Sequence, residues 1–395
     1  MIKLLNVIND YCLYLLVFSV TFENWDPFNF AGSLSITYLS TILYLGSWVP
    51  LIAKNFHFAL LKKFVIPLLS LILVGFICSA IYSEYVEELK YAYHYRALLL
   101  IILMTFIAAH LYVKPKTLPI VLNSYIASML LVFLLVSLGK GVSYENGRLL
   151  IFEENPNVMG AKASLAFLIT VSKLINNYSL RKALIIIPLC IPFISLIAMS
   201  GSRGAFVSLF LGFAVLLYFR RTGVVNKLAV IIFGVLGSVV LITYLLETNP
   251  IIAGRFADTV ESGDIGRNSL WEAAVNVIED HIIIGAGFEG VKPRMYAYSG
   301  AFMNPHNIFL YVYIACGLPG IIFFLIFLLR LTKLLFLHFK QNGDSLNLVL
   351  FVIVIFNMSK QGGSIGKTLF WFFFAVLIGS TVHILSKDDN KEVIK

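Results

Sequence analysis

Apolar residues along the chain are grouped into long runs, and shorter polar stretches separate each run from the next. The runs lie near residues 5–22, 33–53, 64–83, 97–113, 117–138, 158–175, 183–199, 204–219, 228–246, 318–338, 346–358 and 368–386. A helix needs about 20 apolar residues to cross the ~30 Å hydrocarbon core of a membrane. The pattern therefore predicts about 12 transmembrane helices joined by polar connections.

The composition supports this prediction. Hydrophobic residues make up 59% and charged residues 13% of the 395 positions, and the mean hydropathy is +0.89. One soluble core cannot bury so much apolar surface, so we expect an all-α polytopic membrane protein. The four cysteines, Cys12, Cys78, Cys190 and Cys316, lack the spacing of a zinc or redox site. We therefore interpret them as packing residues. The sequence also lacks an HExxH motif, so we predict no metal site and no cofactor.

Lysine and arginine are distributed unevenly between the polar connections. With a cytoplasmic N-terminus, the connections and span ends on the side of the C-terminal tail contain Lys54, Lys62, Lys63, Lys114, Lys116, Arg181, Lys182, Arg220, Arg221, Lys227, Lys333 and Lys340. The positive-inside rule therefore predicts that both termini are cytoplasmic. The net charge of +9 follows from this topology, so membrane lipids are expected partners and nucleic acid is not.

One external connection, residues 247–303, has 57 residues and is far longer than a link between helices requires. Apolar residues recur in it at helical spacing after Asn268 and Ser269, namely at Leu270, Trp271, Ala274, Val275 and Ile278. This spacing predicts a short amphipathic helix at the membrane surface. We expect a single integral-membrane domain, 1–395, in which 247–303 forms an external cap between the ninth and tenth predicted spans.

Arginines gather at the outer mouth of the predicted bundle, against the positive-inside bias. They are Arg96, Arg148, Arg203, Arg255, Arg267 and Arg294. A guanidinium group matches phosphate oxygens in bidentate fashion, so these residues are candidates for binding a phosphate-containing ligand. Ion pairing with carboxylates of the external connections is the alternative for each arginine.

Arg203 and Arg267 are the strongest of these candidates. The segment "MSGSRGAF" joins two predicted spans through very few residues, which holds Arg203 at the membrane boundary between Gly201 and Gly204. Trp271 follows Arg267 by four residues, a helical spacing that can place an aromatic ring beside the arginine or beside a sugar. An exposed charge in a first helical turn is the alternative for Arg267.

His306 and Asn307 stand just before an apolar stretch that Gly317, Pro319 and Gly320 interrupt. We predict a short helix over 306–316 that the glycines separate from the following span. An imidazole is the natural proton acceptor near neutral pH, and neighbouring arginines would keep it neutral. A capping or packing role is the alternative for His306.

The segment "GAGFEG" at 285–290 matches the glycine spacing of a dinucleotide-binding motif. That motif requires a preceding strand and a following helix in a βαβ unit, which the apolar runs do not supply. We therefore predict a flexible turn of the external loop.

Several of these segments occur in an order that resembles the O-antigen ligase and O-antigen polymerase superfamily. They are "RLLIFEENPNVMG", "SGSRGAF", "GRNSLWEAAVNVIEDHIIIGAGFEG" and "NPHNIFLYVYIACGLPGIIFFLIF". The resemblance covers about residues 148–328, whereas the first 140 residues contribute only hydropathy.

The resemblance implies an inverting, metal-independent membrane glycosyltransferase of the C type in the bacterial inner membrane, with its active site and large loop facing the periplasm. The donor would be a glycan on polyprenyl (undecaprenyl) diphosphate. By motif, Arg203 and Arg267 would bind the diphosphate and stabilise its departing charge, and His306 would orient or deprotonate the acceptor hydroxyl. The further substrate-binding candidates are Arg148, Asn157, Arg255, Asn307, Trp271 and Arg294.

Three functions remain open at this point. An O-antigen ligase would transfer the polysaccharide to lipid A-core in lipopolysaccharide biosynthesis, and the single large loop favours it. A polymerase would use the same donor, and the pattern of an arginine, ten residues and a glycine from Arg255 to Gly266 occurs in some polymerases. A secondary transporter is the third, because twelve spans are common in that class, but the centres of the runs are almost free of charge.

Overall fold

The computed structural model describes residues 2–28, 34–145, 147–176, 179–219 and 265–385, together with the single positions 243, 247, 253 and 254. The predicted run at 228–246, Arg255 and most of 247–264 lie outside the described residues. Contacts divide the chain into two compact units. Unit 1 comprises Met1–Lys54, Lys116–Gly263 and His338–Ile353, and unit 2 comprises Asn55–Pro115, Asp264–Leu337 and Val354–Lys395.

Long apolar helices dominate the described residues. Nine of the helices there are long and apolar enough to cross a membrane, and two shorter apolar helices, Arg203–Tyr218 and Leu346–Met358, coincide with further predicted runs. The prediction of an all-α polytopic membrane protein is confirmed. The count of about 12 stays a prediction, because the run at 228–246 is not described.

Unit 1 is built from a helical hairpin, a small β-hairpin and a group of packed helices. Its elements are α1 (Ile2–Ser19), η1 (Val20–Phe22), α2 (Ile36–Trp48), η2 (Val49–Leu51), α3 (Ile52–Asn55, with its last residue in unit 2), η4 (Pro115–Thr117, with its first residue in unit 2), α7 (Leu118–Ser137), β1 (Val142–Glu145), β2 (Arg148–Ile151), α8 (Pro156–Asn176), α9 (Leu180–Ser200) and α10 (Arg203–Tyr218).

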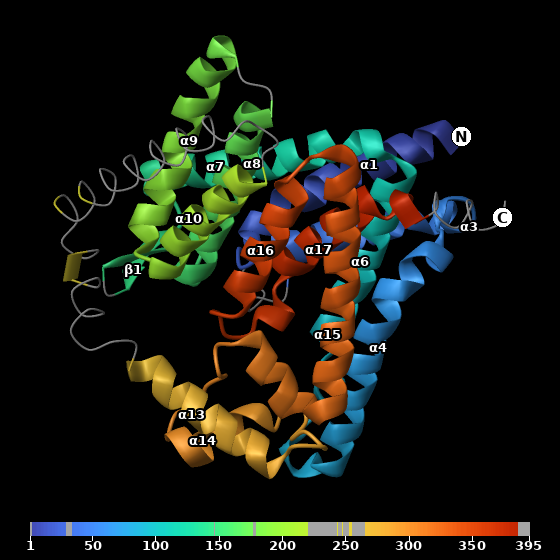
Figure 1. The fold of residues 1–395 in the computed structure, drawn as a ribbon, viewed down its shortest axis with the longest axis vertical. Coiled ribbons are helices and arrows are strands. Elements are labelled where there is room, and N and C mark those ends of the chain that lie inside the picture. The colour runs from blue at the N-terminus through green and yellow to red at the C-terminus, as the bar shows by residue number, and fades with distance from the viewer. Residues whose placement is uncertain are drawn as a thin grey trace. The chain divides into compact units, whose positions relative to one another are not determined.

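Helix α8 forms the centre of unit 1 and packs against α7, α9 and α10 (Figure 1). Small residues allow the close approach. A side chain on Gly160 would meet the Ala205 Cβ atom at 2.6 Å, and one on Gly212 would meet the Leu168 Cδ1 atom at 2.3 Å. The Ser164 hydroxyl donates to the Ala205 carbonyl at 3.0 Å. Small residues and interhelical hydrogen bonds are typical of helix packing in membranes.

Strands β1 and β2 form an antiparallel pair, in which Val142 lies opposite Ile151 and Glu145 opposite Arg148. Leu149 and Ile151 are buried, whereas most of β1 is exposed. The alternation along β2 places its apolar residues against α8 and α9. The hairpin therefore fixes the backbone position of Arg148, the first residue of β2.

Unit 2 contains the remaining described elements. They are α4 (Phe58–Ile81), η3 (Ser83–Tyr85), α5 (Leu89–Ala92), α6 (Tyr95–Val113), α13 (Ile265–Asp280), α14 (Val291–Ser299), α15 (Ile308–Asn342, with its end in unit 1), α16 (Leu346–Met358, with its start in unit 1), η5 (Ser364–Gly366) and α17 (Thr368–Thr381).

Helices α4 and α15 lie side by side and antiparallel in unit 2 (Figure 1). The Arg330 guanidinium donates to the Lys63 carbonyl at 2.6 Å, and the Cys316 thiol lies 3.9 Å from the Leu71 carbonyl. Helix α6 packs against both α4 and α17. A side chain on Gly379 of α17 would meet the Ala108 carbonyl oxygen of α6 at 2.7 Å, so these two backbones are in close contact.

Helix α15 is broken at Gly317, whose φ of 60° and ψ of −164° are not helical. The preceding loop is bonded to this break. The Leu318 amide donates to the Ile282 carbonyl at 3.0 Å, and the Gly287 amide donates to the Ala315 carbonyl at 2.9 Å. The predicted short helix before Gly317 is confirmed, but it begins at Ile308 rather than at His306, whose backbone is left-handed. "GAGFEG" is a turn, as predicted, but its backbone is fixed against the break, and a side chain on Gly285 would meet the Gly317 nitrogen at 2.4 Å.

The predicted amphipathic helix of the large loop is α13, which begins before Asn268 at Ile265. Its buried face consists of Leu270, Ala273, Ala274 and Val277. Val275, which we expected on the apolar face, is 46% exposed. The buried face is therefore rotated from the expected one, because Ala273 and Val277 point inward and Val275 does not.

Candidate functional site

The candidate residues that the structure describes fall into two groups, one in each unit. In unit 1, Arg148 extends from the start of β2 toward two helices. Its Nε atom donates to the Ser200 carbonyl at the end of α9 at 3.0 Å, and its Nη2 atom donates to the Asn157 Oδ1 atom in the first turn of α8 at 2.8 Å. The structure thus brings the candidates Arg148 and Asn157 together.

Arg203 is the first residue of α10, directly after the sharp turn that follows α9. Gly201 ends α9 with a φ of 56°, a left-handed conformation that favours glycine. Ser202 then caps α10, since its hydroxyl accepts from the Ala205 amide at 3.3 Å. A side chain on Gly201 would meet the Arg148 Cγ atom at 3.4 Å, so Arg148 packs on the turn that carries Arg203.

This part of unit 1 is suited to an anionic ligand. Arg148 and Arg203 are both partly exposed. Each is next to the start of a helix, Arg148 through its bond to Asn157 in α8 and Arg203 as the first residue of α10. The N-terminus of a helix carries a partial positive charge and unsatisfied amide donors, which add to the charge of the guanidinium groups. Two arginines of this kind can hold a phosphate or diphosphate group.

In unit 2, Trp271 connects α13 to the segment before α15. Its indole Nε1 atom donates to the Pro305 carbonyl at 3.1 Å, and the side chain is half-buried. Arg267 lies one turn earlier in α13 and is also half-buried. The indole nitrogen therefore positions Pro305, the residue that precedes His306. The helical spacing had indicated only a ring beside Arg267 or beside a sugar.

His306 has a left-handed backbone, with a φ of 51°. Burial and the charge of Arg267 lower the pKa of its imidazole from the ordinary value of 6.5. The neutral form is therefore favoured at neutral pH, as a proton acceptor requires. A side chain on Gly362 would meet the His306 Nδ1 atom at 2.8 Å, so the ring stands directly against this glycine.

Asn307 has a clear local contact. Its Oδ1 atom accepts from the Phe309 amide at 2.9 Å and from the Leu310 amide at 3.4 Å. This is the hydrogen bonding of a helix cap, and it fixes the start of α15 at Ile308, two residues after His306. Its contribution to a site is thus to hold the backbone next to the imidazole.

Arg294 of α14 lies among acidic and aromatic neighbours. Its Nη2 atom is 3.8 Å from a Glu84 carboxylate oxygen, and its guanidinium carbon lies 5.6 Å from the ring centre of Tyr82 and 5.4 Å from that of Tyr85. These contacts match the ion-pairing alternative for this arginine. Arg255 lies outside the described residues.

Two polar groups in the described residues were not singled out by the sequence analysis. His94 caps α6 by accepting from the Ala97 amide at 3.3 Å, and burial lowers its pKa to about 4. Lys162 of α8 forms a buried ion pair with Glu154. The available signal was a lysine inside the apolar run 158–175 with a glutamate eight residues earlier, since a buried cation requires a partner.

A comparison with protein families provides independent support for the motifs. Residues 188–325 match the family model described as O-antigen ligase. This range includes Arg203, Arg267, Trp271, Arg294, His306 and Asn307, and it ends inside α15. A search of curated proteins found no match. The match over residues 188–325 supports the resemblance to the O-antigen ligase superfamily.

Proposed function

We propose that the protein is an O-antigen ligase, a membrane glycosyltransferase that moves a polysaccharide from undecaprenyl diphosphate to lipid A-core. The observation that carries the proposal is His306, which lies within the matched range and whose pKa is lowered by burial and by the charge of Arg267. A neutral imidazole beside an arginine suits transfer from a diphosphate donor to a hydroxyl group. A polymerase that uses the same donor is the alternative.

In the proposed reaction, the acceptor hydroxyl oxygen attacks the anomeric carbon of the donor sugar from the face opposite the diphosphate. The new carbon–oxygen bond forms as the bond to the diphosphate oxygen breaks, so the configuration is inverted. His306 takes the proton of the hydroxyl, and the diphosphate leaves with the bonding electron pair. Positioning and charge stabilisation supply most of the rate acceleration, because a neutralised diphosphate is a good leaving group.

The arginines have distinct roles in this proposal. Arg148 and Arg203 bind diphosphate oxygens in unit 1, where Asn157 and the Ser200 carbonyl orient Arg148. Arg267 stabilises negative charge and keeps His306 neutral in unit 2. Trp271 and Asn307 hold the backbone on either side of His306.

The proposal includes a location and a topology. The protein lies in the bacterial inner membrane with both termini in the cytoplasm, and its active site faces the periplasm. Residues 1–395 form one membrane domain, and 247–303 form the large periplasmic loop. Cysteines introduced singly at Lys140 and Lys340, which lie on opposite predicted faces, should differ in labelling by a thiol reagent that does not cross membranes. Equal labelling of both from the periplasm would contradict the topology.

Deletion of the gene in its host distinguishes the ligase from the polymerase. Loss of a ligase leaves the polymer on its lipid carrier, whereas loss of a polymerase leaves a single repeat on lipid A-core. We expect the first result, measured by gel analysis of lipopolysaccharide and of the lipid-linked pool. Unchanged surface polysaccharide would contradict both functions, and reconstitution of the purified protein with donor and lipid A-core tests the reaction directly.

Gly362→Ala is expected to lower glycan transfer about 100-fold without unfolding the protein. The new methyl group would lie 2.8 Å from the His306 Nδ1 and Cε1 atoms, so the imidazole must move. A ring can be displaced at small cost in stability, but a displaced base no longer meets the hydroxyl. Turnover in proteoliposomes and the melting temperature in detergent measure the two effects.

Gly46→Ala is the matched control, because Gly46 has no atom within 4 Å of an added Cβ. We expect wild-type turnover from this variant. Wild-type turnover from Gly362→Ala would show that the position of the imidazole against Gly362 is not required.

A further inference from the structure

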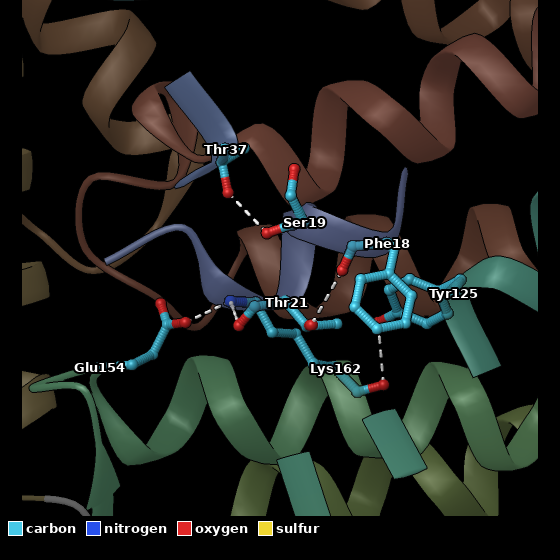
Figure 2. A network of polar contacts seen from close by, with 7 residues as sticks. All are labelled: Phe18, Ser19, Thr21, Thr37, Tyr125, Glu154 and Lys162. Carbon is cyan, nitrogen blue, oxygen red and sulfur yellow. Dashed lines mark hydrogen bonds and ion pairs between the residues drawn. The ribbon is translucent and has the colours of Figure 1, made fainter. Parts of the chain in front are cut away.

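A fully buried ion pair lies in unit 1. One of its members, Glu154, lies in the chain between Arg148 and Asn157 of the candidate site. Lys162 is 0% exposed and Glu154 is 2% exposed, and the ammonium group of Lys162 contacts the carboxylate of Glu154. Figure 2 shows the two side chains meeting beside Thr21. Removing two charges from water is costly, and apolar residues of similar volume often serve stability equally well. The pair therefore calls for an explanation beyond stability.

The cation is fixed by more than the carboxylate. The Lys162 Nζ atom also donates to the Thr21 carbonyl at 3.2 Å, and the Lys162 carbonyl accepts from the Tyr125 hydroxyl at 2.9 Å. Close by, the Thr37 hydroxyl donates to the Ser19 carbonyl at 2.6 Å (Figure 2). The hydrogen bonds connect α8 to α7 and to η1, and they connect the end of α1 to α2. This leaves the Lys162 ammonium little freedom to move.

The anion sits in the short connection between β2 and α8. Phe152 and Glu153 both have left-handed backbones, with φ values of 49° and 59°. Such conformations are unfavourable for residues with side chains and persist only where the surroundings enforce them. The Phe152 ring stacks on Trp25 with ring centres 4.5 Å apart, and Glu154 follows with its carboxylate on Lys162. These two contacts hold the connection in its strained form.

The connection between β2 and α8 also joins Arg148 to Asn157, which are hydrogen bonded to each other in the candidate site. Arg148 begins β2, Asn157 lies in the first turn of α8, and the two are hydrogen bonded at 2.8 Å. Their separation depends on the path of residues 152–156. If the Glu154 carboxylate were free to move, the strained turn would relax and Asn157 would no longer meet the guanidinium.

We propose that Glu154 and Lys162 are positioning residues, whose buried ion pair holds the turn between β2 and α8 so that Arg148 and Asn157 are aligned for the diphosphate of the donor. This inference rests on the proposed function, in which Arg148 and Asn157 bind the donor. Neither member of the pair touches the donor. The first helical hairpin, through Thr21, thereby contributes to a site otherwise built from residues 148–203.

The test uses the double variant Glu154→Gln/Lys162→Met, which removes both charges and nearly preserves both volumes. We expect it to fold with a melting temperature close to that of the wild type, while the KM for the lipid-linked donor rises about 10- to 100-fold. The kcat should change much less, because His306 and Arg267 are untouched. Steady-state transfer by the full-length protein in proteoliposomes gives both constants. Hydrogen exchange of residues 148–157, measured by mass spectrometry, should become faster.

A second variant, Glu154→Asp, tests the proposal even if the double variant does not fold. Glu154→Asp keeps both charges and shortens the reach by one methylene group, and it should raise the donor KM about 3- to 10-fold. Lys173→Met is the matched control, because it removes an exposed lysine from the same helix, and it should leave the KM unchanged. A wild-type KM in Glu154→Asp, or in a folded double variant, would overturn the positioning role. A wild-type protein without any transfer would instead overturn the proposed function.

Discussion

Arg203→Ala is expected to lower glycan transfer by about 10²- to 10³-fold while the protein still folds. In the proposed mechanism this guanidinium group is one of two in unit 1 that neutralise the diphosphate, and Arg203 is the first residue of α10. In the transition state the leaving diphosphate gains charge, so the interaction is worth more there than in the bound donor. We therefore expect most of the loss in kcat. Transfer from undecaprenyl-diphosphate-linked glycan in proteoliposomes measures it.

Folding should survive this substitution for a local reason. The cap of α10 is the Ser202 hydroxyl bonded to the Ala205 amide, and both groups remain. Alanine also has the highest helix propensity. Arg203→Lys should be intermediate, because it keeps the charge and loses the bidentate geometry. Arg181→Ala is the control, as an exposed arginine in the first turn of α9. Equal activities of Arg203→Ala and Arg181→Ala would remove Arg203 from the mechanism.

The fold was predictable wherever a local pattern determines the backbone. Apolar runs predict helices because a span in lipid must satisfy its own backbone hydrogen bonds, and Gly317 with Pro319 predicts the break in α15. The contact between that break and the loop at 282–287 was not predictable. It depends on backbone atoms about 30 positions apart, and the glycines that permit it resemble an ordinary flexible turn.

The candidate site was predictable as a set of residue types and not as a set of contacts. Arg148 and Asn157 were both candidates, but their hydrogen bond and the bond to Ser200 depend on how α8 and α9 pack. Arg294 illustrates the same limit. Its carboxylate neighbour, Glu84, is some two hundred positions away, so inspection of nearby acidic residues cannot reveal the pair.

The buried charges show a different limit. Lys162 lies in a run whose average hydropathy predicts a span, and averaging over a window conceals one lysine. Its partner Glu154 lies before the helix begins, outside the predicted run. A search for charged residues inside apolar runs, each paired with an opposite charge near the end of the same run, would have found this pair.

His306→Asn is expected to lower kcat by about 10²- to 10⁴-fold, the usual contribution of a general base. Asparagine suits this position because it tolerates a left-handed backbone. His306→Ala would also remove the base, but alanine tolerates the left-handed backbone less well than asparagine does. His57→Ala is the control, since His57 is an exposed histidine directly before another helix, α4. Similar turnover from His306→Asn and the wild type would exclude His306 as the proton acceptor.

The pH profile provides a second test of His306. A base must be neutral to accept a proton, so activity is lost as the pH falls through its pKa. Burial and the charge of Arg267 lower that pKa below 6.5, so the wild-type rate should stay constant down to a pH below 6.5 before it declines. Arg267→Gln removes a positive charge that opposes protonation. Its residual activity should therefore decline at a higher pH than that of the wild type, whereas Arg267→Lys, which keeps the charge, should decline near the wild-type pH. An acid limb at the same pH in Arg267→Gln and the wild type would show that Arg267 does not control the protonation of the base.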